Sequence, residues 1–201
     1  TYTITYNLSD ASGNAAIQIT RSVTVKDTIS PIITLVGDTV IIVEAGVAFI
    51  DPGVTAADSF EGDISSKIAV AGSVDTSKLG DYTLTYNVTD AAGNKATEVS
   101  RKVTVTDTTA PVITLQGAAT ATVLKDAAYV DAGATATDVF DGDLTAKVVM
   151  GGDTVDTSKE GVYTITFNVS DTAGNAAVQI NRKVTVTQEP DITGPVITLV
   201  G

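Results

Sequence analysis

The 201-residue sequence contains no cysteine, no histidine and no tryptophan. Without cysteine, the chain can form neither a disulfide framework nor a thiolate metal site. Without histidine, it lacks the commonest general base and the commonest protein ligand for zinc, copper and iron. Aromatic rings come from six tyrosines and four phenylalanines alone, so the chain offers no tryptophan platform on which a sugar ring could stack.

Positive charge is also scarce, and the formal net charge is −12 at pH 7. This excess of negative charge argues against binding to nucleic acid or to an anionic membrane surface. No apolar run approaches the length of a transmembrane helix, so we expect no membrane insertion in this segment. The abundant aspartates are better matched to a hard cation such as calcium.

The sequence repeats itself at intervals of 80 to 84 residues. One recurring stretch is Y-T-L-T-Y-N-V-T-D-A-A-G-N, an alternating strand pattern followed by turn residues. It occurs in this form at Tyr82–Asn94 and with a few substitutions at Tyr2–Asn14 and Tyr163–Asn175. A second recurring stretch, P-x-I-T-L-x-G, occurs at Pro31–Gly37, Pro111–Gly117 and Pro195–Gly201. A fixed period of this kind indicates a tandem array of small domains.

The positions of these stretches divide the chain into four parts. We expect the last two strands of a truncated repeat at 1–27 and complete repeats at 28–108 and 109–190, followed by a linker and the first strand of a further repeat at 191–201. The two end pieces lack the middle strands of a repeat, so the chain is interpreted as a window cut from a longer array.

Within a repeat, the pattern predicts six or seven short strands and no helices. Gly37-Asp38 interrupts the first strand, which suggests that it kinks or changes sheets, and a second strand is expected over Phe49–Ala57. A third strand is expected over Ile68–Val74, with a bulge at Gly72. Gly-x-Tyr at Gly80 and at Gly161 is typical of a tyrosine corner. The fold class predicted is therefore all-β, with tandem immunoglobulin-like antiparallel β-sandwich domains.

The ordered motifs P-x-I-T-L-x-G, D-x-F-[D/E]-G-D, V-D-T-S, Y-T-x-T-[Y/F]-x-V-x-D-x-x-G-N and V-T-V-x-D-T resemble the bacterial Ig-like surface-protein domains, and they are also similar to the related hyalin-repeat group. The resemblance covers essentially the whole chain. It implies an extracellular or cell-surface location in stalks, adhesins and tandem arrays, sometimes as accessory modules of secreted enzymes. It implies no catalytic residues.

Acidic residues recur at positions that the expected topology brings to one end of each sandwich, namely the incoming linker and two loops. For the first complete repeat the candidate metal ligands are Asp27, Asp58, Glu61, Asp63, Asp90 and Asn94. For the second they are Asp107, Asp138, Asp141, Asp143, Asp171 and Asn175.

Calcium takes six to eight oxygen ligands, so we expect one Ca²⁺ at each junction, where it would stiffen the array. The alternative is that aspartate, asparagine and glycine only form turns here, since the spacing is not that of an EF-hand loop. The copy at Tyr2–Asn14 lacks the partner loops and is expected to bind calcium poorly.

Two further features leave alternatives open. Asn7, Asn87 and Asn168 each begin a glycosylation sequon, although asparagine also simply suits a solvent-facing strand position. Arg21, Arg101 and Arg182 have the phase of inward-facing residues, so each arginine either turns outward at a bulge or edge or pairs with a buried carboxylate. The high cost of burying a charge favours the bulge or the edge.

No enzymatic activity is expected, because every candidate acid recurs in both repeats at a turn. The sequence favours a structural or adhesive segment of an extracellular bacterial surface protein, stalk or filament, whose partners are neighbouring repeats and possible further copies of itself. One alternative is a polysaccharide-binding accessory module of a secreted enzyme. Another is a filament subunit that polymerises by strand donation.

Overall fold

The structure is a computed structural model that describes residues 1–198. The chain divides into two compact units. The first comprises Thr1–Val43, Ala48–Asp75 and Gly80–Val105, and the second comprises Glu44–Val47, Thr76–Leu79 and the chain from Thr106 onward. In the part of the chain that the structure describes, no helix has the length and apolar character needed to cross a membrane.

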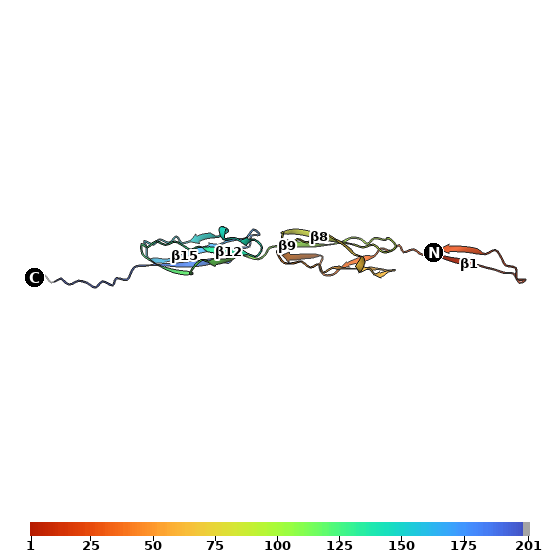
Figure 1. The fold of residues 1–201 in the computed structure, drawn as a ribbon, viewed down its shortest axis with the longest axis horizontal. Helices are drawn as coiled ribbons and strands as arrows, with labels where there is room; N and C mark the ends of the chain where they lie inside the picture. The colour runs from red at the N-terminus through yellow and green to blue at the C-terminus, as the bar shows by residue number, and fades with distance from the viewer. Residues whose placement is uncertain (199–201) are drawn as a thin grey trace. The chain divides into compact units, whose positions relative to one another are not determined.

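The first complete repeat is a sandwich of two sheets, in which β3 lies next to β5 and β5 next to β6, while the other sheet has the order β4-β9-β8-β7. Figure 1 labels β8 and β9, two strands of the larger sheet. The elements are β3 (Ile32–Leu35), β4 (Val40–Glu44), β5 (Val54–Asp58), β6 (Gly62–Asp63), the 3-10 helix η1 (Ser65–Lys67), β7 (Ala69–Ala71), β8 (Gly80–Asn87) and β9 (Val99–Thr106). The first strand does change sheets between β3 and β4, at Gly37, whose φ of 77° is readily adopted by glycine.

The second complete repeat has the same plan, with sheets β10-β12-β13 and β11-β16-β15-β14. Its strand β11 runs parallel to β16, and the other pairs are antiparallel. The elements are β10 (Val112–Leu115), β11 (Thr120–Leu124), β12 (Ala134–Asp138), β13 (Gly142–Asp143), the 3-10 helix η2 (Thr145–Lys147), β14 (Val149–Gly152), β15 (Gly161–Asn168) and β16 (Ile180–Thr187). The all-β sandwich predicted from the sequence is confirmed.

The core of each repeat forms where the inward face of the long hairpin strand meets the smaller sheet. In the first repeat, Leu84, Tyr86 and Val88 pack with Ile33, Ala56 and Ile64. The matching cluster of the second repeat consists of Ile113, Ala136, Leu144, Ile165, Phe167, Val169 and Val184. Alternate residues of a strand point to the same face, so the period-2 pattern of the sequence is enough to select these side chains.

Several predictions about local structure require correction. The strand expected over Phe49–Ala57 begins only at Val54, because Asp51 Oδ1 accepts a hydrogen bond of 3.2 Å from the Gly53 amide and turns the preceding segment. The expectation of no helices is also wrong in detail, since η1 and η2 are single 3-10 turns. Each is preceded by an aspartate that accepts a bond from the first helical amide, 2.9 Å for both Asp63 to Ser65 and Asp143 to Thr145.

Glycine is required where the edge strand bends beside the long hairpin strand. Gly72 has a φ of 93°, and a Cβ there would lie 2.3 Å from the carbonyl oxygen of Thr83. A Cβ at Gly152 would likewise lie 2.3 Å from the carbonyl oxygen of Thr164. The irregularity expected at Gly72 is therefore present, but the strand expected over Ile68–Val74 is shorter than predicted, because β7 ends at Ala71 and Gly72 lies beyond its end. The tyrosine corner is confirmed at Tyr163, whose hydroxyl donates to the carbonyl oxygens of Asp156 at 2.8 Å and Lys159 at 3.1 Å.

The two arginines of the complete repeats are buried, which contradicts the bulge or edge position favoured by the sequence. Arg101 is 0% exposed on the central strand β9, and its Nη1 lies 2.8 Å from Asp51 Oδ1. Its Nη2 also donates to the carbonyl oxygens of Val36 at 2.6 Å and Gly53 at 3.1 Å. Arg182 pairs with Asp131 in the same way. The Arg101 guanidinium can be buried because the Asp51 carboxylate and the carbonyls of Val36 and Gly53 accept from its two Nη atoms, while its Nε is buried without a partner.

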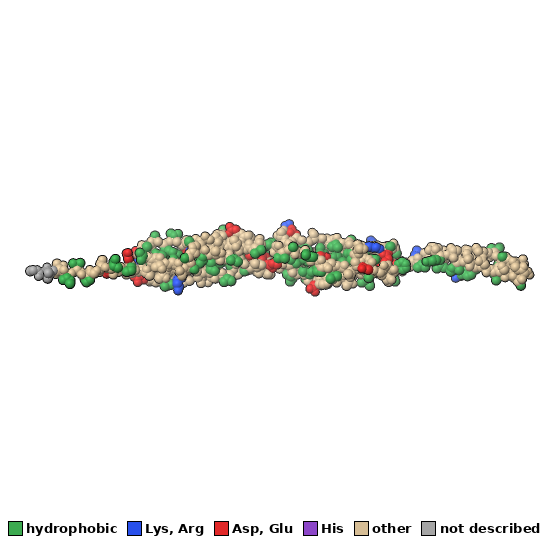
Figure 2. Space-filling view, turned by 60° about the horizontal axis from the view of Figure 1, so that its bottom comes forward, with side chains coloured by type: hydrophobic (Ala, Val, Ile, Leu, Met, Phe, Trp, Pro, Cys, Tyr) green, Lys and Arg blue, Asp and Glu red, His purple; other side chains and the backbone are tan. Residues whose placement is uncertain are grey.

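The N-terminal hairpin consists of β1 (Tyr2–Tyr6) and β2 (Ile19–Val23), paired so that Ile4 lies opposite Arg21. Its large apolar side chains are exposed, and hydrophobic side chains are visible on this hairpin in Figure 2. The first strand of a further repeat, expected within 191–201, is not formed over 191–198, and 199–201 lie outside the described residues.

Candidate metal centres

Three aspartates from separate parts of the first complete repeat meet at one place. Asp27 lies in the segment before β3, Asp58 ends β5, and Asp90 begins the turn after β8. One carboxylate oxygen from each lies within 4.8 Å of one from each of the others. Asp58 and Asp90 are both 6% exposed. The topology expected for the sandwich therefore does bring these three predicted ligands together.

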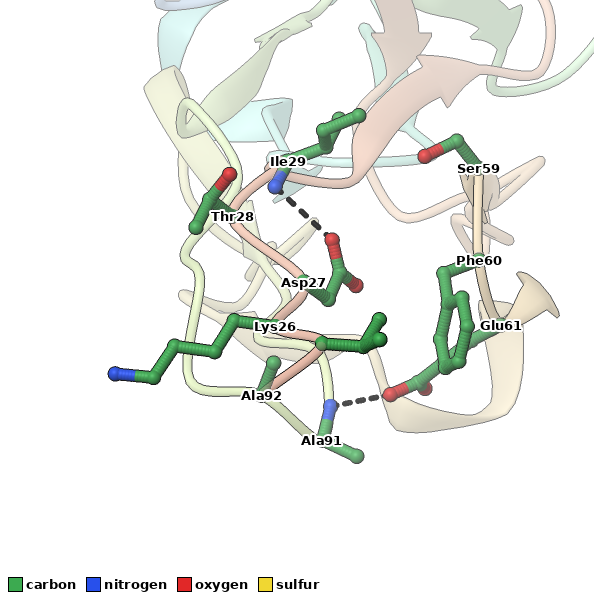
Figure 3. A pocket seen from close by; sticks show the side chains of 10 residues that line it. Lys26, Asp27, Thr28, Ile29, Ser59, Phe60, Glu61, Ala91 and Ala92 are labelled. Atoms are coloured by element: carbon green, nitrogen blue, oxygen red, sulfur yellow. Dashed lines mark hydrogen bonds between the residues drawn. The ribbon is translucent and has the colours of Figure 1, made fainter. Parts of the chain in front are cut away.

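Two of these aspartates use one oxygen to form a turn and leave the other without a partner. Asp58 Oδ1 accepts hydrogen bonds from the amides of Phe60 at 2.8 Å and Glu61 at 3.0 Å. Asp27 Oδ1 accepts one of 3.0 Å from the Ile29 amide, drawn in Figure 3. The Oδ2 atoms of Asp27 and Asp58 are buried and have no hydrogen-bond partner. Leaving a carboxylate oxygen buried and unsatisfied is costly, so this geometry fits an additional positive ligand.

Asp90 and Asn94 form the third wall of this centre. The Asn94 amide donates to Asp90 Oδ1 and its Nδ2 donates to Asp90 Oδ2, both at 2.7 Å. Burial alone would raise the pKa of the Asp90 carboxyl, but the bonds from Asn94, Gly93 and Ala92 together outweigh it and the pKa is lowered. Asn94 Nδ2 also donates to the carbonyl oxygen of Asp27 at 3.3 Å. Asn94 thus donates to Asp90 and to the linker, which holds an ionised Asp90 beside the linker.

The remaining two acids predicted for this centre are engaged nearby. Glu61 is ion-paired with Lys67 and accepts a bond from the Ala91 amide, so it joins the two loops (Figure 3). Asp63 Oδ1 accepts from the Ser65 amide at 2.9 Å and from the Ser65 hydroxyl at 2.6 Å. These bonds lower the pKa of Asp63, with the hydroxyl bond as the largest cause. Both residues shape the loop around Asp58, and neither belongs to the group of three.

The second complete repeat places Asp107, Asp138 and Asp171 in the corresponding positions, where they are 7%, 8% and 8% exposed. Asp138 Oδ1 accepts from the amides of Phe140 at 2.8 Å and Asp141 at 2.9 Å, and Asp107 Oδ1 accepts from Thr109 at 3.1 Å. As in the first repeat, Oδ2 of the linker aspartate and Oδ2 of the loop aspartate are buried without a partner.

Electrostatic repulsion is evident at this second centre. Burial raises the pKa of the Asp107 carboxyl, and the negative charges of Asp138, Asp171 and Glu44 raise it further. Within residues 1–198, only the first trio brings one oxygen of each aspartate within 4.8 Å, so the second trio is more open. The two centres share their composition but differ in spacing.

The other predicted ligands of the second repeat hold its loops together. Asn175 Nδ2 donates to Asp171 Oδ2 at 2.7 Å and to the carbonyl oxygens of Asp107 at 3.1 Å and Thr109 at 3.4 Å. Asp141 accepts from the Thr172 amide at 2.6 Å and from its hydroxyl, and these bonds lower the pKa of Asp141. Asp143 Oδ1 accepts a hydrogen bond of 2.9 Å from the amide of Thr145, the first residue of η2. Asp141 therefore corresponds to Glu61, and Asp143 to Asp63.

Glu44 also contacts the linker of the second centre, although no repeated motif of the sequence includes it. Its carboxylate accepts hydrogen bonds from Thr108 and Thr109, the two residues after Asp107. The repeat pattern could not reveal it, because the equivalent position of the second repeat is Leu124. The sequon asparagines bond to side chains of the neighbouring strand segment, for example Asn87 Nδ2 to Glu98 Oε2 at 2.7 Å, and glycosylation of them stays a prediction.

The candidate ligands of each centre are carboxylate oxygens, and the sequence contains no histidine or cysteine that could supply a nitrogen or sulfur ligand. This donor set fits a hard cation such as Ca²⁺, which accepts irregular coordination by six to eight oxygens. Mg²⁺ requires near-ideal octahedral geometry and retains its water, so it fits such a centre less well.

Comparison with known proteins places the chain among bacterial surface domains. The family described as bacterial surface protein, Ig-like domain, matches residues 33–105 and again 113–186. The chain is 35% identical over 147 residues to the pesticidal crystal protein Cry22Aa of Bacillus thuringiensis, covering 70% of this chain and 20% of that protein. It is 29% identical over 182 residues to an uncharacterised 81.3 kDa protein of Acholeplasma phage L2, covering 87% of this chain and 24% of that protein.

The chain thus spans about a fifth to a quarter of the length of these two relatives. Among solved structures, the M60 catalytic domain with the CBM51-1 and CBM51-2 domains from Clostridium perfringens ZmpB is 14% identical, with a TM-score of 0.45, covering 91% of this chain and 33% of that one. The two family matches fall one on each complete repeat and together span more than half of the sequence. The chain therefore belongs to the bacterial surface protein Ig-like domain family.

Proposed function

We propose that this chain is a structural segment of an extracellular bacterial surface protein, in which each complete repeat binds a calcium ion that fixes its incoming linker. The location is supported by the family to which the chain belongs. A structural role is supported by the tandem plan, in which each complete repeat has its own sandwich and core.

One observation carries the calcium proposal. In both repeats, the linker aspartate and the loop aspartate each keep a buried Oδ2 without a partner, while an asparagine-bound aspartate lies beside them. Turn formation explains Oδ1 of each aspartate but leaves Oδ2 unexplained. A divalent cation would satisfy these oxygens and cancel the repulsion among the three carboxylates of each centre.

Calcium at this place would join three segments that the backbone connects only distantly. The linker would be tied to the loop after β5 or β12 and to the turn after β8 or β15. A ligand that binds only the folded state at 100 times its dissociation constant stabilises that state by about 2.7 kcal/mol. The repeats would then act as spacers whose linkers stiffen at extracellular calcium concentrations, where modules of this kind bind at about 10⁻⁴–10⁻³ M.

The proposal is tested by calorimetric melting of the whole chain in millimolar calcium and in chelator, with magnesium at equal concentration as the control. We expect calcium to raise the melting temperatures of both repeats more than magnesium does. Asp58→Asn should remove the shift of the first repeat and Asp138→Asn that of the second. Melting curves that coincide in calcium and chelator would refute calcium binding. The polysaccharide-binding and strand-donation alternatives stay predictions.

A further inference from the structure

Glu44, the last residue of β4, bonds to the linker segment that enters the second repeat. Its Oε1 accepts from the Thr108 amide at 2.8 Å, the Thr109 amide at 3.1 Å and the Thr109 hydroxyl at 2.8 Å. Its Oε2 accepts from the Thr108 hydroxyl at 2.7 Å. These bonds, led by that from the Thr108 amide, lower the pKa of Glu44 to about 2. Glu44 therefore remains ionised at neutral pH.

The segment that Glu44 binds is the one that presents Asp107 to the second centre. Asp107 directly precedes Thr108, and its Oδ2 is buried and unpartnered. Asn175 donates to the carbonyl oxygens of Asp107 at 3.1 Å and Thr109 at 3.4 Å. The donors of residues 108–109 thus bond to Glu44, and the carbonyls of residues 107 and 109 bond to Asn175. Together these bonds fix the backbone on both sides of the Asp107 carboxylate.

The linker of the first centre shares one of these bonds. Asn94 Nδ2 donates to the carbonyl oxygen of Asp27 at 3.3 Å, as Asn175 Nδ2 does to that of Asp107. Position 124, which corresponds to Glu44 in the second repeat, is a leucine with 45% exposure. A glutamate at the end of this strand is therefore not part of the common repeat pattern.

We propose that Glu44 is a positioning residue for the second cation centre, so that calcium binding at Asp107, Asp138 and Asp171 depends on it while binding at the first centre does not. This inference rests on the calcium binding proposed above. Glu44 favours calcium binding at the second centre in two ways. Glu44 holds the linker in the geometry that presents Asp107, which reduces the ordering required on binding. Its negative charge also acts on Asp107 and would attract the cation.

The dependence must be reciprocal, because coupling free energies between sites are symmetric. If Glu44 favours calcium at the second centre, calcium in turn favours the bonds between Glu44 and the linker. Calcium should therefore slow hydrogen exchange of the Thr108 and Thr109 amides, which donate to Glu44.

The test uses calcium titration calorimetry on the whole chain in an Asp58→Asn background, which leaves the second centre to be measured alone. Outer residues that orient metal ligands typically change affinity 10- to 100-fold, so Glu44→Leu should raise the dissociation constant about 10-fold. Glu44→Gln keeps an acceptor oxygen and should have a smaller effect. Glu160→Gln removes one exposed negative charge of the same repeat and serves as the matched control, with no expected change.

The same Glu44 variants in an Asp138→Asn background measure the first centre, whose affinity should not change. Equal affinities of the second centre with glutamate, glutamine and leucine at position 44 would overturn the role of Glu44 and leave calcium binding intact. An equal loss at both centres would also overturn it, because it would indicate a general loss of structure. Absence of calcium binding in the unmodified chain would instead refute the proposed function and this inference with it. Amide exchange of Thr108 and Thr109 that calcium leaves unchanged would contradict the inference without any substitution.

Discussion

The N-terminal hairpin and the β8–β9 hairpin have nearly the same sequence and the same register but different surroundings. Tyr6 and Ile4 are 45% and 43% exposed, whereas their counterparts Tyr86 and Leu84 are 0% and 5% exposed. Ile4 lies opposite Arg21 as Leu84 lies opposite Arg101. Because the hairpins are alike, the difference comes from Ile33 of β3, Ala56 of β5 and Ile64, which pack against one hairpin and have no counterpart on the other within the described residues.

The turns at the ends of these hairpins extend the comparison to the metal centre. Asp10 accepts from the Asn14 amide at 2.9 Å and from its Nδ2 at 2.8 Å, as Asp90 does from Asn94. The turn is therefore built locally in both places. Only Asp90 has Asp27 and Asp58 beside it, so a candidate metal centre requires the rest of the sandwich.

The largest expected difference concerns the arginines. Arg101→Met would leave the Asp51 carboxylate and two buried carbonyls without their donor, so we expect the first repeat to lose about 3–4 kcal/mol of unfolding free energy. Arg21→Met, on the exposed hairpin, should change stability by less than about 0.5 kcal/mol. Urea unfolding followed by circular dichroism measures both. Adding Asp51→Asn to Arg101→Met should recover part of the loss, and no recovery would contradict an ion-pair explanation.

The next largest difference concerns the strand core. Leu84→Ala removes a side chain that is 5% exposed and should cost about 2.5–3 kcal/mol, because the packed sandwich cannot fully close the cavity. Ile4→Ala removes a side chain that is 43% exposed and should cost less than about 0.5 kcal/mol. Equal losses in thermal or urea unfolding would mean that the β1–β2 hairpin is covered in solution.

Calcium dependence separates the two turns. At about 10 mM calcium, Asp90→Asn should cost the first repeat about 2 kcal/mol of calcium-dependent stabilisation, as expected for a dissociation constant of a few tenths of a millimolar. Asp10→Asn should leave the response to calcium unchanged. The measurement is the difference in melting temperature between calcium and chelator for each variant. A calcium response lost equally in both variants would contradict a centre built from Asp27, Asp58 and Asp90.

The smallest expected effect is in the pH dependence of the metal-free protein. The bonds from Asn14 lower the pKa of Asp10 below 3.8, whereas burial and neighbouring carboxylates raise that of Asp107 above it. Because the folded-state pKa of Asp107 is raised, the native state binds more protons than the unfolded state. The free-energy cost of ionising Asp107 in the native state therefore grows as pH rises from about 3.8 through the folded pKa. Asp107→Asn should therefore stabilise the metal-free second repeat at neutral pH, and the advantage should disappear in acid. Carboxyl titration by NMR checks both shifts, and a fall of the Asp107 pKa on adding calcium would support binding there.

The hairpin comparison also explains how far the sequence could predict the fold. The alternation in Tyr82–Val88 selected the buried face, and Gly37-Asp38 marked the change of sheet, because strand periodicity and glycine conformation are local properties. The segment Phe49–Gly53 was misassigned as strand, since its turn depends on which acceptor Asp51 offers to Gly53. The buried position of Arg101 was also missed, because its partners are Asp51 and the carbonyls of Val36 and Gly53, far away in sequence.

The same division holds for the candidate centres. Local sequence is enough to indicate which aspartates form turns, since the bonds of Asp58 to Phe60 and of Asp90 to Asn94 lie within four residues. It also placed the linker and two loops at one end through the expected topology. Folding of the whole chain is needed to bring Asp27, Asp58 and Asp90 together, to engage Glu61 and Asp63 elsewhere, and to bond Glu44 to the second linker. The reason is physical: a turn needs only neighbours in the chain, whereas burial and repulsion among carboxylates arise where the folded chain brings distant segments together.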